Sequence, residues 1–109
     1  MAKYVAEGCR VLVATMTGGE RGDILNPELD TPENRARLPE LRQAEMERAR
    51  QTLGIEQVWL GYEDSGFFQG EPWPPTPPGT LAATPVEEAA ARLVPIIRDF
   101  RPHVVVTYD

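Results

Sequence analysis

The chain has 109 residues, enough for one domain or part of one, and 41% of them are hydrophobic, as is ordinary for a globular protein. Seventeen acidic against eleven basic residues give a net charge of −6, which argues against a nucleic-acid partner because binding a phosphate backbone needs a basic patch. No apolar run approaches the roughly 20 residues of a membrane span, no leader opens the sequence, and the single Cys9 cannot form an internal disulfide, so we expect a soluble, cytoplasmic protein with no membrane partner.

The first half of the chain predicts a helix, a strand and a second helix. Residues 1–7 have helical spacing and stop at Gly8. Residues 11–14 are a short apolar run typical of a strand buried on both faces, and Cys9 just before it is expected to be a small core residue. The polar loop 15–23 follows. After a turn-rich stretch in which Asp30 or Thr31 could cap what comes next, apolar spacing predicts a helix over 39–53, ended by Gly54.

The second half repeats the alternation. Residues 58–60 predict a second strand, closed by the polar turn 61–66, and the proline-rich stretch 69–85 excludes regular structure. A helix is predicted over 85–99, with Thr84 as its cap and Pro85 in its first position, and Pro95 should kink it or split off its last turn. Residues 104–107 predict a third strand.

This order of elements predicts an α/β fold in which helices sandwich a parallel sheet. Ligands of open parallel sheets collect at the carboxyl ends of the strands, so the loop 15–23, with paired glycines and charged side chains, would form one wall of an active site. A glycine-rich loop alone is a weak signal, because this one lacks the spacing of a dinucleotide loop or a phosphate-binding P-loop. A solvated surface turn is the alternative.

Longer strings carry more information. AKYVAEG, VLVATMTGGERGDILNP, LRQAEMERARQTLG, WLGYEDSG and IIRDFRPHVVVTYD, in this order, closely resemble the mycothiol S-conjugate amidases of the zinc-dependent N-acetylglucosaminyl deacetylase (LmbE/PIG-L-like) family. The resemblance covers essentially the whole chain. It implies a Rossmann-like three-layer sandwich and hydrolysis of the amide bond of mycothiol S-conjugates, which releases an N-acetylcysteine conjugate from glucosaminyl-inositol in thiol-based detoxification.

The resemblance also implies zinc, but the motifs that hold it are missing. The family binds zinc through a His-Pro-Asp-Asp segment, which also supplies the general base, and a later His-Pro-Asp-His segment; neither occurs in this sequence. We therefore expect residues 1–109 to be a partial domain truncated at both ends, inactive by itself, with no catalytic residue, no metal ligand and no bound zinc. The only histidine, His103, would start the third strand, about 20 Å from the carboxyl edge.

In the family's sheet order, three-two-one-four, the missing first strand would lie between residues 11–14 and 104–107. Its absence would expose two strand edges, so we expect an isolated chain that is poorly folded or aggregates, unless the two flanking strands pair directly.

Two residues match the family's substrate-binding positions. Arg42, completed by Glu45 in an RxxE pattern, would bind the sugar-inositol part of the substrate, and Asp64 of the DSG turn would accept hydrogen bonds from glucosamine hydroxyls. The alternatives are an Arg42–Glu45 pair on a solvated helix and an Asx-turn from Asp64 onto Gly66. Trp73 could contact substrate or only pack on the domain.

The sequence leaves three functions of different kinds open. The first is the enzyme fragment, either a conjugate amidase or a related N-acetylglucosaminyl-inositol deacetylase, acting on a small molecule. The second is a non-catalytic α/β module that kept a sugar-binding wall. The third, a flavodoxin-like nucleotide binder, ranks last because no phosphate loop is present.

Overall fold

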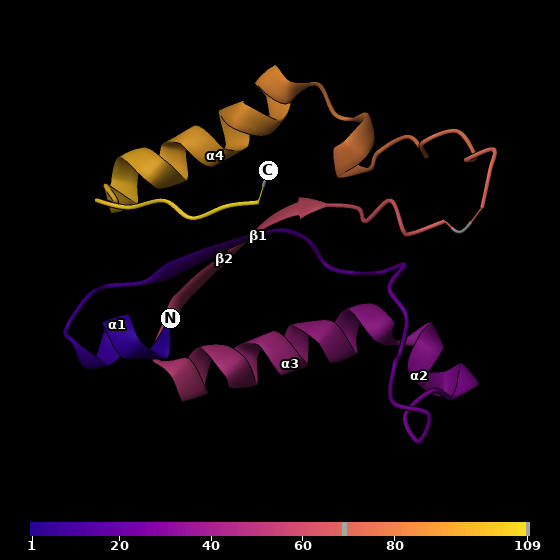
Figure 1. Ribbon diagram of the computed structural model, residues 1–109, viewed down its shortest axis with the longest axis horizontal. Helices are drawn as coiled ribbons and strands as arrows, with labels where there is room; N and C mark the ends of the chain where they lie inside the picture. Colours follow the sequence, from indigo (N-terminus) through magenta and orange to yellow (C-terminus); the bar gives the residue numbers. More distant parts are fainter. Residues whose placement is uncertain (69, 109) are drawn as a thin grey trace.

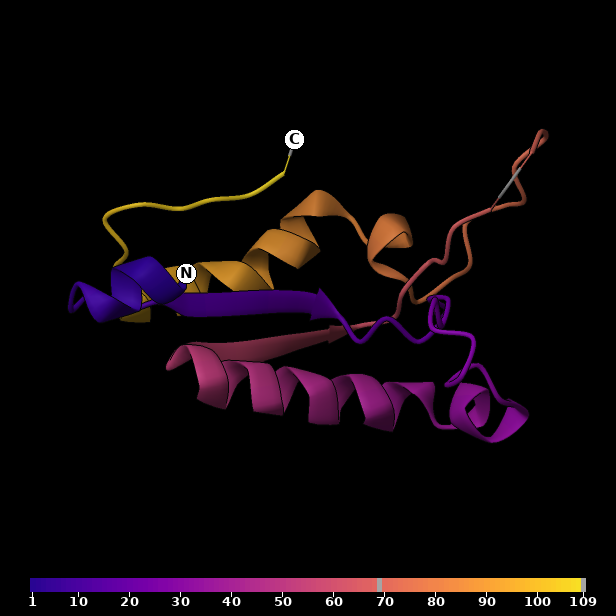
Figure 2. The same ribbon diagram turned by 60° about the horizontal axis from the view of Figure 1, so that its bottom comes forward.

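The computed structural model describes residues 1–68 and 70–108 and shows two parallel strands between helices (Figure 1). β1 (Leu12–Thr17) pairs with β2 (Glu56–Tyr62), and α3 (Leu38–Leu53) forms the crossover between them. α3 lies on one face of the sheet, with α1 (Ala2–Ala6) beside its C-terminal end, whereas α4 (Val86–Phe100) lies on the other face (Figures 1 and 2). The predicted α/β fold with a parallel sheet is confirmed.

The helices of the first half begin and end close to the predicted residues. α3 has Pro39 in its first turn, where a missing N–H costs nothing, and Gly54 ends it with a φ of 66° that favours glycine. A short helix, α2 (Pro32–Ala36), was not predicted because its sequence is typical of a turn. Thr31 caps it, since the Thr31 Oγ1 atom accepts the Asn34 N–H at 3.2 Å.

Both strands are longer than their apolar runs. β1 continues past Ala14 to Thr17, and β2 extends in both directions beyond residues 58–60. The ladder explains the extension: Thr15 lies opposite Trp59 and Thr17 opposite Tyr62, so pairing carries polar residues into the sheet, with a register shift between the two threonines. The loop after β1 therefore begins at Gly18.

α4 differs from its prediction at its N-terminal cap and at Pro95. Thr84 does not cap it, because its hydroxyl donates to the Thr80 carbonyl at 2.9 Å, and Pro85 takes the capping position instead. The helix also does not split at Pro95 but runs on to Phe100. Before it, η1 (Leu81–Ala83) is a single 3-10 turn. The half-buried residues of α4 form one stripe, Ala89, Leu93, Ile96 and Phe100.

The predicted third strand does not form. Within the described residues the sheet has two strands, and 104–108 is extended but pairs with neither. Val104, Val105 and Val106 are 76%, 63% and 89% exposed. A run of β-branched residues becomes a strand only where a neighbouring strand satisfies its backbone, and within the described residues 104–108 pairs along neither outer edge of the two-stranded sheet. Direct pairing of 104–107 with β1, the predicted alternative, is also not seen.

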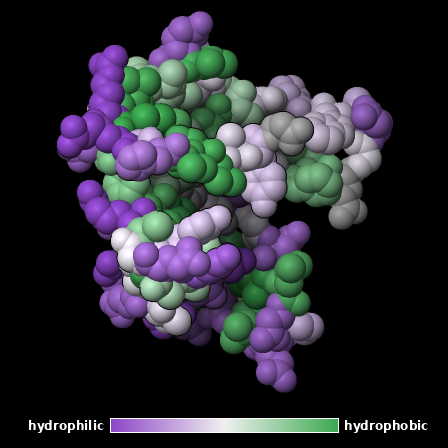
Figure 3. Space-filling model, turned by 60° about the vertical axis from the view of Figure 1, so that its left-hand side comes forward, coloured by the Kyte–Doolittle hydropathy of each residue, from purple (hydrophilic) through white to green (hydrophobic). Residues whose placement is uncertain are grey.

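The core is correspondingly small. Its buried hydrophobic residues are Leu38, Ile55, Leu60 and Tyr62, and the accessible surface is 8671 Å², against roughly 6,000 Å² for a folded monomer of this mass. The radius of gyration is 16.1 Å, against about 13 Å for a closed domain. Hydrophobic side chains reach the surface in Figure 3.

Cys9 is exposed, so its predicted place in the core is wrong; it lies in the turn between α1 and β1. Among the residues that the structure describes, no helix combines the length and apolarity needed to cross a bilayer.

Candidate functional site

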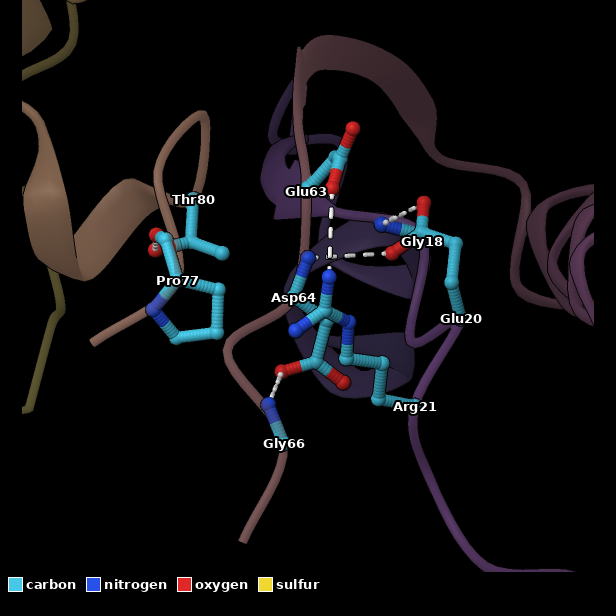
Figure 4. Close-up of polar contacts among 8 residues, drawn as sticks. All are labelled: Gly18, Glu20, Arg21, Glu63, Asp64, Gly66, Pro77 and Thr80. Atoms are coloured by element: carbon cyan, nitrogen blue, oxygen red, sulfur yellow. Dashed lines mark hydrogen bonds and ion pairs between the residues drawn. The ribbon is translucent and has the colours of Figure 1, made fainter. Parts of the chain in front are cut away.

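Two loops meet where β1 and β2 end, and the Glu20 carboxylate lies between them (Figure 4). One oxygen of Glu20 accepts the Gly18 N–H at 3.1 Å, and the other accepts the Asp64 N–H at 3.1 Å. Beside it, Arg21 forms an ion pair with Glu63 at 3.5 Å. The loop after β1 and the turn after β2 are thus joined by two charged contacts.

Arg42 reaches the same loop from the first half of α3. Its Nη2 atom donates to the Asp23 carbonyl at 3.1 Å, while its Nη1 atom donates to Glu45 at 2.8 Å. The predicted Arg42–Glu45 pair on the helix surface is therefore present, but it uses only the Nη1 atom of the guanidinium. The group carries five N–H donors in a planar fork, so donors remain for a ligand.

Asp64 forms the predicted Asx-turn. Its Oδ1 atom accepts the Gly66 N–H at 3.0 Å. Gly66 has a φ of 75°, a left-handed conformation that favours glycine. Asp64 is half-buried, and within the described residues its Oδ2 atom has no hydrogen-bond partner. One acceptor oxygen is left for a ligand.

A groove of about 380 Å³ lies between α3 and the sheet. Its lining combines backbone and threonines of the β1 end with apolar side chains, including Thr15, Gly18, Arg42, Met46 and Trp59. Asp64 does not line this groove, so the structure brings Arg42 and Asp64 to one loop without placing both in one cavity.

A second hollow, of about 410 Å³, is lined by residues 20–25 of the loop after β1 and by the Asp30–Arg35 ion pair. The Arg35 guanidinium, hydrogen-bonded to Asp30, holds the pKa of that carboxyl below its ordinary value.

The metal-binding donors of this stretch are scattered. In the part of the chain that the structure describes, no three His, Cys, Asp or Glu side chains gather closely enough to hold a metal ion. His103 is exposed in the bend after α4, and Cys9 is exposed in the turn before β1.

Two residues of this region have roles that the sequence did not predict. The sequence marks Glu20 only as one of the charged residues of the loop 15–23, because its two acceptor contacts depend on the meeting of both loops. Thr80 is fully buried, and its hydroxyl donates to the Pro77 carbonyl at 2.8 Å, which anchors the end of the proline-rich loop (Figure 4). No sequence signal marks it. Trp73, on the same loop, is 63% exposed rather than packed on the domain.

Comparisons with known proteins agree on one family. A family model described as GlcNAc-PI de-N-acetylase, PIG-L, matches residues 1–109. A mycothiol S-conjugate amidase of Streptomyces coelicolor is 53% identical over 100% of this chain and 38% of the relative's length. Two 1D-myo-inositol 2-acetamido-2-deoxy-alpha-D-glucopyranoside deacetylases, of Catenulispora acidiphila and Streptomyces scabiei, are 41% and 40% identical over 100% of this chain and 35% of their own lengths. The chain thus spans little more than a third of the length of these relatives.

Proposed function

Because the chain belongs to the GlcNAc-PI de-N-acetylase (PIG-L) family, we propose that it forms the substrate-binding part of an enzyme that hydrolyses an amide bond at a glucosamine nitrogen. The preferred substrate is a mycothiol S-conjugate, since identity to the amidase is 53% against 41% and 40% for the deacetylases. The enzyme would act in thiol-based detoxification in the cytoplasm. The related deacetylation of N-acetylglucosaminyl-inositol is the second candidate, supported by those two relatives.

The observation that carries this proposal is that Arg42 and Asp64 both contact the loop after β1, at the carboxyl edge of the sheet. Arg42 contacts the loop through the Asp23 carbonyl, and Asp64 contacts it through Glu20. The guanidinium offers N–H donors and Asp64 offers one carboxylate oxygen, a combination that suits the hydroxyl groups of a sugar joined to inositol.

Zinc is implied by the family resemblance, but the donors of this stretch do not fit it. Near the loops, Glu20 accepts two N–H groups and Glu63 pairs with Arg21, and no metal-binding cluster occurs among the described residues. We propose that residues 1–109 bind and orient the sugar-inositol part of the substrate and supply neither a zinc ligand nor the general base. The hydrolytic step is therefore assigned to no residue of this stretch.

The test is substitution of the two proposed substrate-binding residues in the intact protein. Arg42→Ala and Asp64→Ala should each weaken transition-state stabilisation by about 1.5–3 kcal/mol, which is roughly a 10- to 150-fold loss of kcat/KM, because each removes hydrogen bonds to a charged group. Arg48→Ala, an exposed arginine on the same helix, is the matched control and should leave kcat/KM unchanged.

Unchanged kcat/KM in both variants would overturn the proposal. The two candidate reactions are separated by measuring kcat/KM for a mycothiol S-conjugate and for 1D-myo-inositol 2-acetamido-2-deoxy-alpha-D-glucopyranoside with the same preparation. A higher value for the second substrate would favour the deacetylase. Binding without turnover of either one would favour the non-catalytic sugar-binding module.

A further inference from the structure

We propose that Glu20 is a positioning residue that locks the loop after β1 to the turn after β2 and thereby holds Asp64 in place for the substrate. This inference rests on the proposed function for its last step. Its first step, the lock itself, stands on the structure: each oxygen of one carboxylate accepts a backbone N–H from a different loop, at 3.1 Å in both cases.

A carboxylate is the side chain best suited to this position. The N–H groups of Gly18 and Asp64 lie just past the ends of β1 and β2, so the strand ladder supplies no acceptor for them. An ionised carboxylate accepts on both oxygens at once, and its hydrogen bonds are about twice as strong as those between neutral groups. A glutamine has one acceptor oxygen and would turn an NH₂ group toward the other N–H donor. Replacing Glu20 by glutamine therefore breaks one of the two contacts while keeping the size of the side chain.

The glycine at position 18 supports the same assignment. A Cβ atom built on Gly18 would clash with the Glu20 carboxylate, and φ at Gly18 does not lie in the left-handed region. The backbone at this position thus tolerates alanine, and the added Cβ would collide only with the Glu20 carboxylate, which is the far end of a flexible side chain. Gly18→Ala should displace the Glu20 carboxylate without unfolding the sheet.

The lock acts on Asp64 through its backbone. With its N–H held by Glu20 and its Oδ1 atom held by the Gly66 N–H, the Asp64 side chain has a fixed direction, and its Oδ2 atom is the part left for a ligand. The neighbouring Arg21–Glu63 pair, at 3.5 Å with both side chains largely exposed, holds the same two loops more weakly. Loss of Glu20 should therefore loosen Asp64 more than loss of Arg21 would.

The experiment has a structural arm and a binding arm, both on the intact protein. Amide hydrogen exchange is measured at Gly18 and Asp64 in wild type, Glu20→Gln and Gly18→Ala, with Glu28→Gln as an exposed control in the following loop. Exchange at the Asp64 amide should accelerate at least tenfold in Glu20→Gln and Gly18→Ala and should not change in the control. Unchanged exchange in Glu20→Gln would overturn the lock.

The binding arm uses 1D-myo-inositol 2-acetamido-2-deoxy-alpha-D-glucopyranoside and calorimetry. Glu20→Gln should weaken binding 3- to 10-fold, and the double variant with Asp64→Ala should bind no more weakly than Asp64→Ala alone, because Glu20 acts through Asp64. Additive losses, or unchanged affinity in Glu20→Gln, would overturn the positioning role. Unchanged affinity in Asp64→Ala would instead refute the substrate-binding role of Asp64 in the proposed function, and with it the role of Glu20 in binding, while the exchange arm still decides the lock.

Discussion

Two stretches of this chain have nearly the same sequence character and opposite structures. The apolar run that leads into β1 reads Val-Leu-Val-Ala from Val11, and the segment after α4 reads Val-Val-Val-Thr from Val104. The first lies in a parallel ladder with β2, whereas the second is extended, exposed and unpaired within the described residues. The difference shows that a β-branched composition favours the extended conformation but does not by itself form a strand. A neighbouring strand is also needed, because backbone N–H and C=O groups need hydrogen-bond partners.

The largest expected effect is on the free energy of unfolding, and it separates a buried residue of the paired strands from an exposed residue of the unpaired segment. Leu60 on β2 is 8% exposed, and Val106 is 89% exposed. Leu60→Ala should lower the free energy of unfolding by about 2–5 kcal/mol through lost burial and a cavity, whereas Val106→Ala should change it by less than about 0.5 kcal/mol. Urea unfolding of both variants checks this. A cost for Val106→Ala close to that of Leu60→Ala would show that residues 104–108 are packed in solution.

An intermediate effect is expected at the contact that holds α4 on the paired strands. Arg92 donates to the Leu60 carbonyl at 3.2 Å, and its guanidinium lies 4.4 Å from the centre of the Tyr62 ring. Because this side chain is about half exposed, we expect Arg92→Ala to lower the free energy of unfolding by about 1–2 kcal/mol. Arg98→Ala, exposed on the same helix, should change it by less than about 0.5 kcal/mol. Equal losses for the two would mean that α4 is held by its apolar stripe alone.

The smallest effect concerns the surface of α3, the helix that covers the paired strands. Hydrogen bonds from Arg50, and secondarily from Gln51, lower the pKa of Glu47 from 4.5 to about 2. A lowered pKa in the folded state means that this pair stabilises the fold above about pH 4.5 and that the contribution is lost as pH falls toward 2.

An NMR titration of the side-chain carboxyls measures this directly. Arg50→Ala should raise the pKa of Glu47 toward 4.5, and Gln51→Ala should raise it less, since the Arg50 contact is the larger cause. A Glu47 carboxyl that titrates near 4.5 in the unchanged chain would contradict the prediction.

Local patterns were enough to predict the elements whose causes are local. The spacing of apolar residues with Gly54 predicted α3, and the two apolar runs predicted β1 and β2 in a parallel sheet. The failures share a physical cause, since each depended on a contact that the local pattern does not specify. The strand at 104–107 lacks a ladder, Thr84 donates to a carbonyl instead of capping, and Glu20 joins loops that are remote in sequence. Arg42 and Asp64, assigned by resemblance, lie at the same loop, and their role in binding stays a prediction.

Contacts between Glu63 and residues 80–81 close the base of the excursion formed by residues 64–79. Glu63 forms a bridge with Thr80, its carbonyl accepts the Leu81 N–H at 3.1 Å, and Thr80 is fully buried. The chain therefore leaves the domain after Glu63 and returns at Thr80, and the bridge between these residues holds the two ends of the loop together. The entropy lost on closing this loop then depends only on the number of residues between them. Doubling such a loop adds only about 0.6 kcal/mol. A peptide epitope or a fluorophore carrier inserted beside the exposed Trp73 should consequently leave the strand pairing intact, so this excursion is the natural place to label the protein.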